Sequence, residues 1–161
     1  MTEALAGRVR RLEDLEAIRA LDAAYCRALD SGSWDALVSL FLPDGEFVGL
    51  STARGHASLR SFFAGLADGG LTAFWHHVTN LEIDLDGDRA HVCSFLFQPC
   101  VLRGVPHVAG GRYHDDLVRV DSAWRYQRKR VVFDYFTPLA EGWDHSRFSL
   151  DSARATRWEH A

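Results

Sequence analysis

A carboxylate, a phenol and an imidazole stand at two places in the chain from which they could meet in one apolar interior. Tyr25 and Asp30 lie near the end of a predicted long helix, and His76 lies at the start of the first of four predicted long strands. A neutral imidazole can take a proton from carbon or oxygen near neutral pH, and a carboxylate on its other nitrogen sets its tautomer and stabilises its cation. A tyrosine hydroxyl can polarise a carbonyl or protonate a leaving hydroxide. The three residue types therefore predict acid/base chemistry.

Each of these residues also has a purely structural interpretation. His76 could be a histidine that makes hydrogen bonds within the fold, and Tyr25 could be a core aromatic with a satisfied hydroxyl. Asp30 could bond the backbone of the turn at residues 31–32. Against this, a carboxylate at a helix C-terminus faces the negative end of the helix dipole, at a cost of ~0.3–1 kcal/mol. The residue types leave both interpretations open.

The pattern along the chain predicts helices first and strands afterwards. Apolar residues spaced three and four apart, starting at Leu12, predict a helix with one buried face. The helices are predicted over residues 12–30, 34–41 and 57–66, with a short strand over 46–50. After a glycine pair the strands are predicted over 74–85, 89–102, 107–120 and 124–136. Tight turns at residues 86–87 and 121–122 join consecutive strands. This order indicates an α+β fold in which a curved antiparallel sheet wraps around helices.

The composition favours one globular domain and argues against several classes of partner. The chain has 161 residues, 47% of them hydrophobic and 12% aromatic, which suffices for a core. The formal net charge is -4 and no basic run exceeds residues 128–130, so nucleic-acid binding is not expected. No segment approaches membrane-spanning length, and the N-terminus lacks an apolar signal core. Three cysteines without a CxxC motif are expected to be reduced, which predicts a cytoplasmic location.

Further side chains are expected to line a pocket. Tyr113 and Asp115 share one face of a strand, although Asp115 could instead pair with Arg112 or Arg119. Aromatic residues are expected to form the core or the pocket wall and to favour an apolar ligand; these are Trp75, Phe95, Phe97, Phe133 and Tyr135. His77 is expected to face away from the pocket. No metal is expected, because the histidines look scattered, and no cofactor is expected, because no glycine-rich loop fits a nucleotide. No nucleophile elbow that would indicate a catalytic serine is present.

Three stretches resemble the SnoaL-like branch of the nuclear transport factor 2-like superfamily. They are the helix end at residues 25–37, the strand and turn at 76–90, and the Gly-Arg-Tyr-His-Asp-Asp-Leu-Val-Arg-Val-Asp segment with the following Trp-Arg at 111–125. The resemblance covers residues 12–136. It implies a single SnoaL-like domain over 1–161, built as a cone-shaped barrel with an interior pocket. It also implies a homo-oligomer, either a dimer or a trimer. The tail at 137–161 is expected to cover the mouth of the barrel or to fray.

The same resemblance implies a set of roles. Tyr25, Asp30 and the segment at 113–115 are similar to a pattern in bile-acid 7α-dehydratase. Asp30 and His76 are similar to the base dyad of hexachlorocyclohexane dehydrochlorinase, and scytalone dehydratase shares an Asp–His pair beside a tyrosine. Lys129 stands where the dehydrochlorinase has an arginine that assists chloride departure, and it is expected to contact substrate. Lysine keeps the charge of that arginine but not its two-pronged donor geometry.

The expected function is that of a cofactor-independent lyase or isomerase, dehydratase-like, acting on a hydrophobic small molecule. His76 would remove a proton, Asp30 would orient it, and Tyr25 would assist the departing or enolising oxygen. The superfamily also contains cyclases and non-catalytic adaptors. A polyketide-cyclase-like enzyme and a small-molecule-binding or accessory subunit without chemistry are therefore kept as alternatives.

Overall fold

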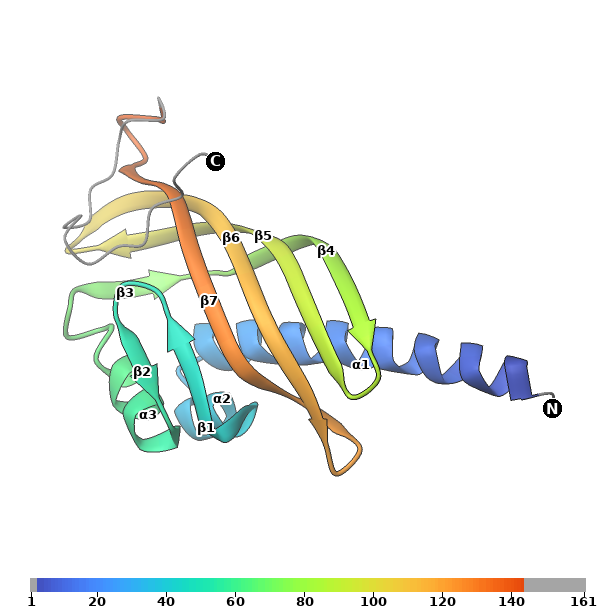
Figure 1. The fold of residues 1–161 in the computed structure, drawn as a ribbon. Helices are drawn as coiled ribbons and strands as arrows, with labels where there is room; N and C mark the ends of the chain where they lie inside the picture. Colours follow the sequence, from blue (N-terminus) through green and yellow to red (C-terminus); the bar gives the residue numbers. More distant parts are fainter. Residues whose placement is uncertain (1–2, 144–161) are drawn as a thin grey trace.

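Three helices and one mixed sheet make up the fold in the computed structural model, which describes residues 3–143 (Figure 1). The helices are α1 (Glu3–Asp30), α2 (Trp34–Ser39) and α3 (His56–Ala64). The strands are β1 (Phe41–Val48), β2 (Thr52–Arg54), β3 (Leu71–Phe74), β4 (His77–Asp86), β5 (Arg89–Leu102), β6 (Val105–Val120) and β7 (Ala123–Pro138). The expected α+β class is confirmed.

The sheet has the order β2-β1-β7-β6-β5-β3, and β4 also pairs with β5. The β1–β7 pair is parallel and the other pairs are antiparallel, so the sheet is mixed. Figure 1 shows the long strands β5, β6 and β7 bending around the inner half of α1, with α2 and α3 at one end. The concave face and the helices enclose one core. The cone shape is as predicted, but the sheet closes to a half-barrel and not to a full barrel.

Helix α1 is longer than the sequence pattern predicts. It begins at Glu3 rather than at residue 12, and its first half projects beyond the sheet (Figure 1). The pattern predicts Leu12 on the buried face, but 65% of its surface is exposed, because the sheet covers the helix only from about Ile18 onward. The apolar spacing identifies the correct face of the helix, while the length of the overhang depends on where the sheet ends. None of the helices in the described part of the chain combines the length and apolar character needed to cross a bilayer.

The strand expected over residues 74–85 is divided in two. Strand β3 ends at Phe74 and β4 begins at His77, although both pair with β5. The break faces Pro99, which has no N–H and cannot complete the ladder there. Further bounds also differ, since α2 ends at Ser39, β1 extends over Phe41–Val48 and α3 ends at Ala64. Strand β6 begins at Val105 rather than at residue 107, and the short strand β2 was not predicted. Strand β7 continues to Pro138, and residues 144–161 of the predicted tail lie outside the described residues.

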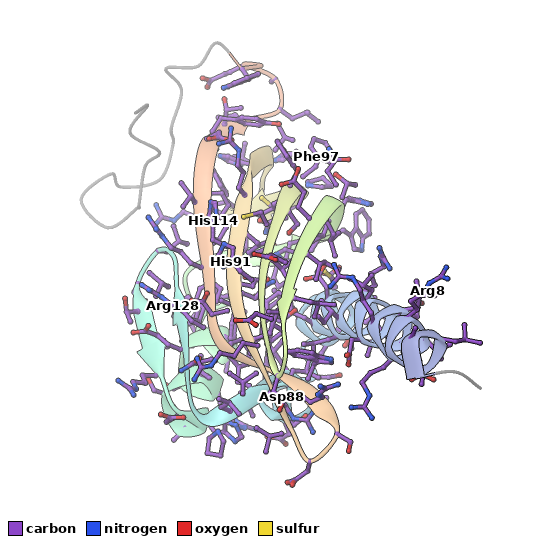
Figure 2. All side chains as sticks on the ribbon, turned by 45° about the vertical axis from the view of Figure 1, so that its right-hand side comes forward. Arg8, Asp88, His91, Phe97, His114 and Arg128 are labelled. Atoms are coloured by element: carbon purple, nitrogen blue, oxygen red, sulfur yellow. The ribbon has the colours of Figure 1, made fainter. Side chains whose placement is uncertain are left out.

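The alternation along β5 runs opposite to the expectation for its aromatic residues. Phe95 and Phe97 point outward and are about half exposed, at 48% and 49%, whereas Ser94 and Gln98 point into the core. Phe97 is labelled at the outer side of the sheet in Figure 2. Pairing of β5 with β6 sets this phase over the whole strand, so a single register choice moves every side chain to one face or the other. The expectation that Phe95 and Phe97 belong to the core is wrong.

Gly111 allows a close approach of β6 to β7 at a bulge, where the strand register shifts between Gly110 and Gly111. A Cβ atom on Gly111 would lie 2.2 Å from the carbonyl oxygen of Val132, which is backbone and has little room to move. We expect Gly111→Ala to lower the free energy of unfolding by about 1–3 kcal/mol, measured by urea denaturation.

Gly7 supplies the matched control for this substitution. It lies in α1, and the space that a Cβ atom would occupy there is open. Gly7→Ala should therefore raise the free energy of unfolding by about 0.5–1 kcal/mol, because alanine favours the helix. Equal stability of Gly111→Ala and the wild type would contradict the close approach at the bulge.

Candidate active site

Asp30 and His76 meet where the end of α1 reaches the break between β3 and β4. The neighbouring Trp75 N–H donates to the Pro99 carbonyl at 3.1 Å. Successive residues of an antiparallel strand direct their N–H groups to opposite edges, so the His76 N–H points away from β5. It donates to Oδ2 of Asp30 at 3.0 Å. The end of α1 and the strand break together hold the His76 backbone against this carboxylate.

The same carboxylate also holds the imidazole ring. Nδ1 of His76 lies 2.6 Å from Oδ1 of Asp30, and the two side chains are 7% and 21% exposed. An ionised carboxylate can only accept hydrogen bonds, so Nδ1 carries the proton of this bond, and in a neutral imidazole the lone pair is then on Nε2. Asp30 therefore binds His76. The alternative role, in which the Asp30 side chain bonds the turn backbone at residues 31–32, is not observed among the described contacts. The arrangement is that of a general base with an orienting carboxylate.

His76 forms part of the wall of a small interior cavity between α1, α3 and the concave face of the sheet. The cavity has a volume of about 60 Å³. Its apolar lining consists of Leu29, Phe47, Leu50, Phe62, Phe63, Leu66, Leu71, Phe74, Val131, Phe133 and Phe136, and its polar lining of Tyr25, His76, Gln98 and Tyr113. Ligand pockets for drug-sized molecules commonly span ~300–1,000 Å³. A ring compound would fit only if half-buried residues at the rim, such as Phe62 and Leu71, moved aside.

Tyr25 lies at the centre of this core and is fully buried. Its ring makes edge contacts with Phe41, Phe63 and Tyr126, at centroid distances of 6.3, 6.4 and 5.7 Å. The Tyr25 hydroxyl has no hydrogen-bond partner among the described residues. The neighbouring Tyr113 hydroxyl has only a small lowering effect on the pKa of Tyr25. Burial, with smaller effects of nearby acidic groups, raises the pKa of Tyr25 well above its usual value. The group stays protonated and can donate to a ligand in the cavity.

Lys129 lies behind the tyrosines in a fully buried ionic network. Its Nζ donates to Oδ2 of Asp115 at 2.7 Å and to Oδ1 of Asp22 at 3.3 Å. Three phenol rings surround the ammonium group, with centroids at 4.4 Å for Tyr25, 4.0 Å for Tyr113 and 4.7 Å for Tyr126. The network places one positive charge between two carboxylates in the core.

The charges in this network alter one another's protonation. Burial lowers the pKa of Lys129, but the charges of Asp115 and Asp22 more than reverse that effect, so its pKa lies above the usual value. Burial raises the pKa of Asp115 to about 6, against the opposing effect of Lys129. Lys129 is therefore a permanent cation in the core and unsuited to act as a base.

The structure brings together some of the predicted site residues and separates others. Tyr25, His76, Tyr113 and Phe133 line the cavity, with Asp30 directly behind His76. Four residues expected at the substrate are not among the lining residues, namely Trp75, Asp115, Lys129 and Tyr135.

Each of these four has a structural reason for its position. Trp75 is 67% exposed, because it precedes His76 on an extended chain and points the other way. Asp115 pairs with Lys129 rather than with Arg112 or Arg119, and both partners lie behind the tyrosines. Tyr135 packs against Trp143 in a tilted arrangement, with ring centroids 4.6 Å apart.

Sequence reasoning missed two polar residues of this region. Gln98 lines the cavity and is 5% exposed, and Asp22 belongs to the buried network and is 7% exposed. Asp22 stands among Ile18, Leu21 and Tyr25 on the apolar face of α1, and a lone carboxylate on such a face is itself a signal. Gln98 could be placed only once the phase of β5 was known.

A set of metal-ligating side chains lies elsewhere, on the outer face of the sheet. His91, Cys93 and His114 bring one ligand atom each to within 4.8 Å of one another. The expectation that the histidines are scattered is wrong for His91 and His114. Within the described residues the cavity wall itself contains one histidine and no cysteine, so these ligands are separate from the Asp30–His76 site.

Comparison with known proteins assigns the chain to a family. Residues 10–130, about three quarters of the chain, match the model of the SnoaL-like domain. The chain belongs to the SnoaL-like family. An uncharacterized protein of Mycobacterium tuberculosis is 27% identical to this SnoaL-like domain over 126 residues, which are 75% of this chain and 86% of that protein.

Solved structures share the same fold. The SnoaL-like domain superposes on hexachlorocyclohexane dehydrochlorinase of Novosphingobium barchaimii LL02 with a TM-score of 0.76 at 22% identity, over 83% of this chain and 94% of that one. A protein of Novosphingobium aromaticivorans assigned as a scytalone dehydratase gives a TM-score of 0.73 at 21% identity, over 88% and 97%. At these identities the similarity shows the nuclear transport factor 2-like fold of this SnoaL-like domain and not its substrate.

Proposed function

We propose that this SnoaL-like domain is a cofactor-independent lyase or isomerase that acts on a hydrophobic small molecule through Asp30 and His76. The observation that carries the proposal is that the Asp30 carboxylate accepts two hydrogen bonds from His76, one from Nδ1 and one from the backbone N–H. His76 lies in the wall of an apolar cavity. A histidine held in one tautomer and nearly excluded from water is prepared to accept a proton at Nε2. The dehydratase and dehydrochlorinase among the structural neighbours are consistent with this class of reaction.

Dehydration is the proposed reaction. Nε2 of His76 takes a proton from a carbon next to an activating group, and the electrons of that C–H bond form the new double bond. The C–O bond on the neighbouring carbon breaks, and the leaving hydroxide takes the proton of the Tyr25 hydroxyl and departs as water. The imidazolium, stabilised by Asp30, then returns its proton to the Tyr25 phenolate. The apolar lining strengthens these charge interactions relative to water.

A second candidate is a small-molecule-binding or accessory subunit without chemistry, and one observation favours it. The cavity measures only about 60 Å³, which is less than a ring-shaped substrate needs. A polyketide-cyclase-like enzyme would use the same base and the same hydroxyl donor on a longer substrate.

Incubation with a panel of cyclic β-hydroxy ketones and their halogenated analogues separates these candidates. Mass spectrometry should detect loss of water or of hydrogen halide with the wild type and not with His76→Gln. Binding of panel compounds without conversion, equal in the wild type and in His76→Gln, would support the binding subunit and refute the lyase.

Tyr25→Phe should separate the catalytic role of the hydroxyl from its role in packing. We expect kcat to fall about 10²-fold, because one preorganised donor to the departing oxygen is lost. The free energy of unfolding should stay constant or rise, because the substitution removes a buried hydroxyl that has no partner among the described residues. Steady-state kinetics and urea denaturation measure the two quantities. Loss of stability with unchanged kcat would instead assign Tyr25 to the core alone.

A further inference from the structure

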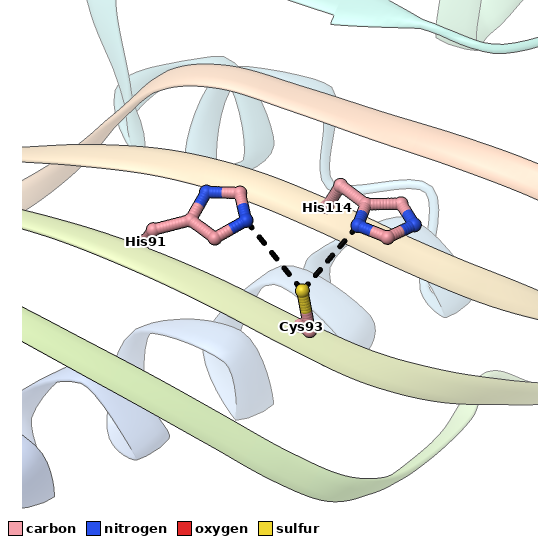
Figure 3. Close-up of side chains that lie close together, drawn as sticks. All are labelled: His91, Cys93 and His114. Atoms are coloured by element: carbon pink, nitrogen blue, oxygen red, sulfur yellow. Dashed lines mark hydrogen bonds between the residues drawn. The ribbon is translucent and has the colours of Figure 1, made fainter.

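The outer face of the sheet carries three metal-ligating side chains that the proposed reaction does not use. His91 and Cys93 lie two residues apart on β5, so both point to the same face. Cys93 is directly paired with His114 on β6. Figure 2 shows the two histidines on neighbouring strands, and Figure 3 shows them on either side of the cysteine. The spacing of the ligands comes from strand alternation and cross-strand pairing, not from a sequence motif.

The two sulfur-to-nitrogen distances fit one tetrahedral ion. Sγ of Cys93 lies 3.5 Å from Nε2 of His91 and 3.3 Å from Nδ1 of His114. With Zn–S bonds of about 2.3 Å and Zn–N bonds of about 2.0–2.1 Å, tetrahedral geometry requires S···N separations of about 3.5 Å. All three ligand atoms lie within 4.8 Å of one another. One ion can therefore reach all three atoms with small side-chain adjustments.

The surroundings prepare one histidine for this role. Nδ1 of His91 donates to Oδ1 of Asp116 at 3.1 Å, which leaves the lone pair of Nε2 directed at Cys93. A carboxylate on the second nitrogen of a ligating histidine is the usual outer partner of zinc sites. On β4, Asp84 is paired with His91 and Glu82 with Cys93, so two further carboxylates stand across the strand.

The charges around the cluster act in both directions. Arg130 on β7 is paired with His114, and Arg112 stands two residues before His114 on β6, on the same face of the strand. Together with Asp116, the carboxylates of β4 offset these two positive charges.

We propose that His91, Cys93 and His114 form a Zn²⁺ site on the outer face of the sheet, with the fourth position open to solvent. Sulfur and imidazole ligands in this number select zinc over the hard cations magnesium and calcium. The site lies on the face opposite the cavity that contains His76, and it is independent of the proposed reaction.

Zinc titration of the whole chain, prepared without a histidine tag, tests the proposal. Isothermal titration calorimetry should show one Zn²⁺ per chain for the wild type. Cys93→Ser and His114→Gln should each weaken binding by more than about 100-fold, and Asp116→Ala by about 10–100-fold. Cys100→Ser and His77→Gln are the matched controls, because neither residue belongs to the cluster, and they should bind like the wild type.

Cobalt substitution gives a readout that depends on the thiolate. The Co²⁺-loaded wild type and Cys100→Ser should show a sulfur-to-cobalt charge-transfer band, and Cys93→Ser should lack it. Retained circular dichroism spectra would show that the variants fold. The proposal is overturned if the wild type binds no stoichiometric Zn²⁺, or if Cys93→Ser binds as tightly as the wild type.

Discussion

Asp30→Asn is expected to lower kcat/KM about 10²–10⁴-fold while the protein remains folded. The asparagine oxygen can still accept the His76 backbone N–H, so the local geometry is preserved. The amide carries no charge to stabilise the imidazolium, and it does not impose the tautomer with Nε2 unprotonated. Kinetics with a substrate identified in the dehydration panel measures the effect. The loss should appear mainly in kcat, because the carboxylate acts through His76 and does not line the cavity.

The matched controls for this prediction are His77→Gln and Asp35→Asn. His77 is the exposed neighbour of His76, and Asp35 is an exposed carboxylate paired with Arg60. Both variants should keep wild-type activity. Proton NMR adds a readout that needs no substrate, since the short Nδ1–H···Oδ1 bond should give a far-downfield imidazole proton that Asp30→Asn removes. Full activity of Asp30→Asn together with loss of that signal would exclude the dyad from the reaction.

Lys129→Met is expected to lower the free energy of unfolding by about 3–5 kcal/mol. Lysine and methionine have similar length, so packing changes little, but Asp22 and Asp115 lose the cation that compensates their burial. The three tyrosine rings around Nζ also lose their contact with a cation. Urea denaturation at neutral pH measures the loss.

The pH dependence of that loss has a defined sign. The folded pKa of Asp115, about 6, lies above its usual value, so between pH 4 and pH 6 the folded state holds a proton that the unfolded state has released. The contribution of this carboxyl to stability therefore falls as pH rises through that window. Removing Lys129 raises the pKa of Asp115 further, so the variant continues to lose stability above pH 6, where the wild type no longer does. Lys129→Met should therefore cost more at about pH 8 than at about pH 5.

A combined variant provides the control for the buried network. Lys129→Met with Asp22→Asn and Asp115→Asn removes all three charges and should recover most of the stability lost in Lys129→Met. A loss below about 1 kcal/mol in Lys129→Met alone would show that water or a shift of the carboxylates compensates the missing cation.

Local patterns were sufficient for the order and type of most elements. Three- and four-residue spacing identified the inner half of α1, and alternation between turn residues identified the long strands, because each of these signals depends only on neighbours along the chain. The Asp30–His76 pairing was predicted from residue types at a helix end and a strand start, together with the family resemblance, and the structure places the two side chains in contact. Its catalytic role stays a prediction.

The faces of the strands and the long-range pairs depended on the tertiary structure. Residue type favours Phe95 and Phe97 in the core, but the pairing of β5 with β6 turns them outward and turns Gln98 inward. Lys129 was predicted to contact substrate, but it is held by Asp22, 107 residues away in the chain. His91, Cys93 and His114 converge only through cross-strand register.

The sequence by itself determined the fold class, the inward face of α1 beyond Ile18 and the residue types available for acid/base chemistry. The tertiary structure decided which polar groups line the cavity, which pair in the buried ionic network and which meet on the outer face of the sheet. The physical reason is that helix and strand periodicity arise from local backbone geometry. Register and burial are instead set by the free energy of the whole sheet. A shift of one residue in the register exchanges every inward side chain for an outward one.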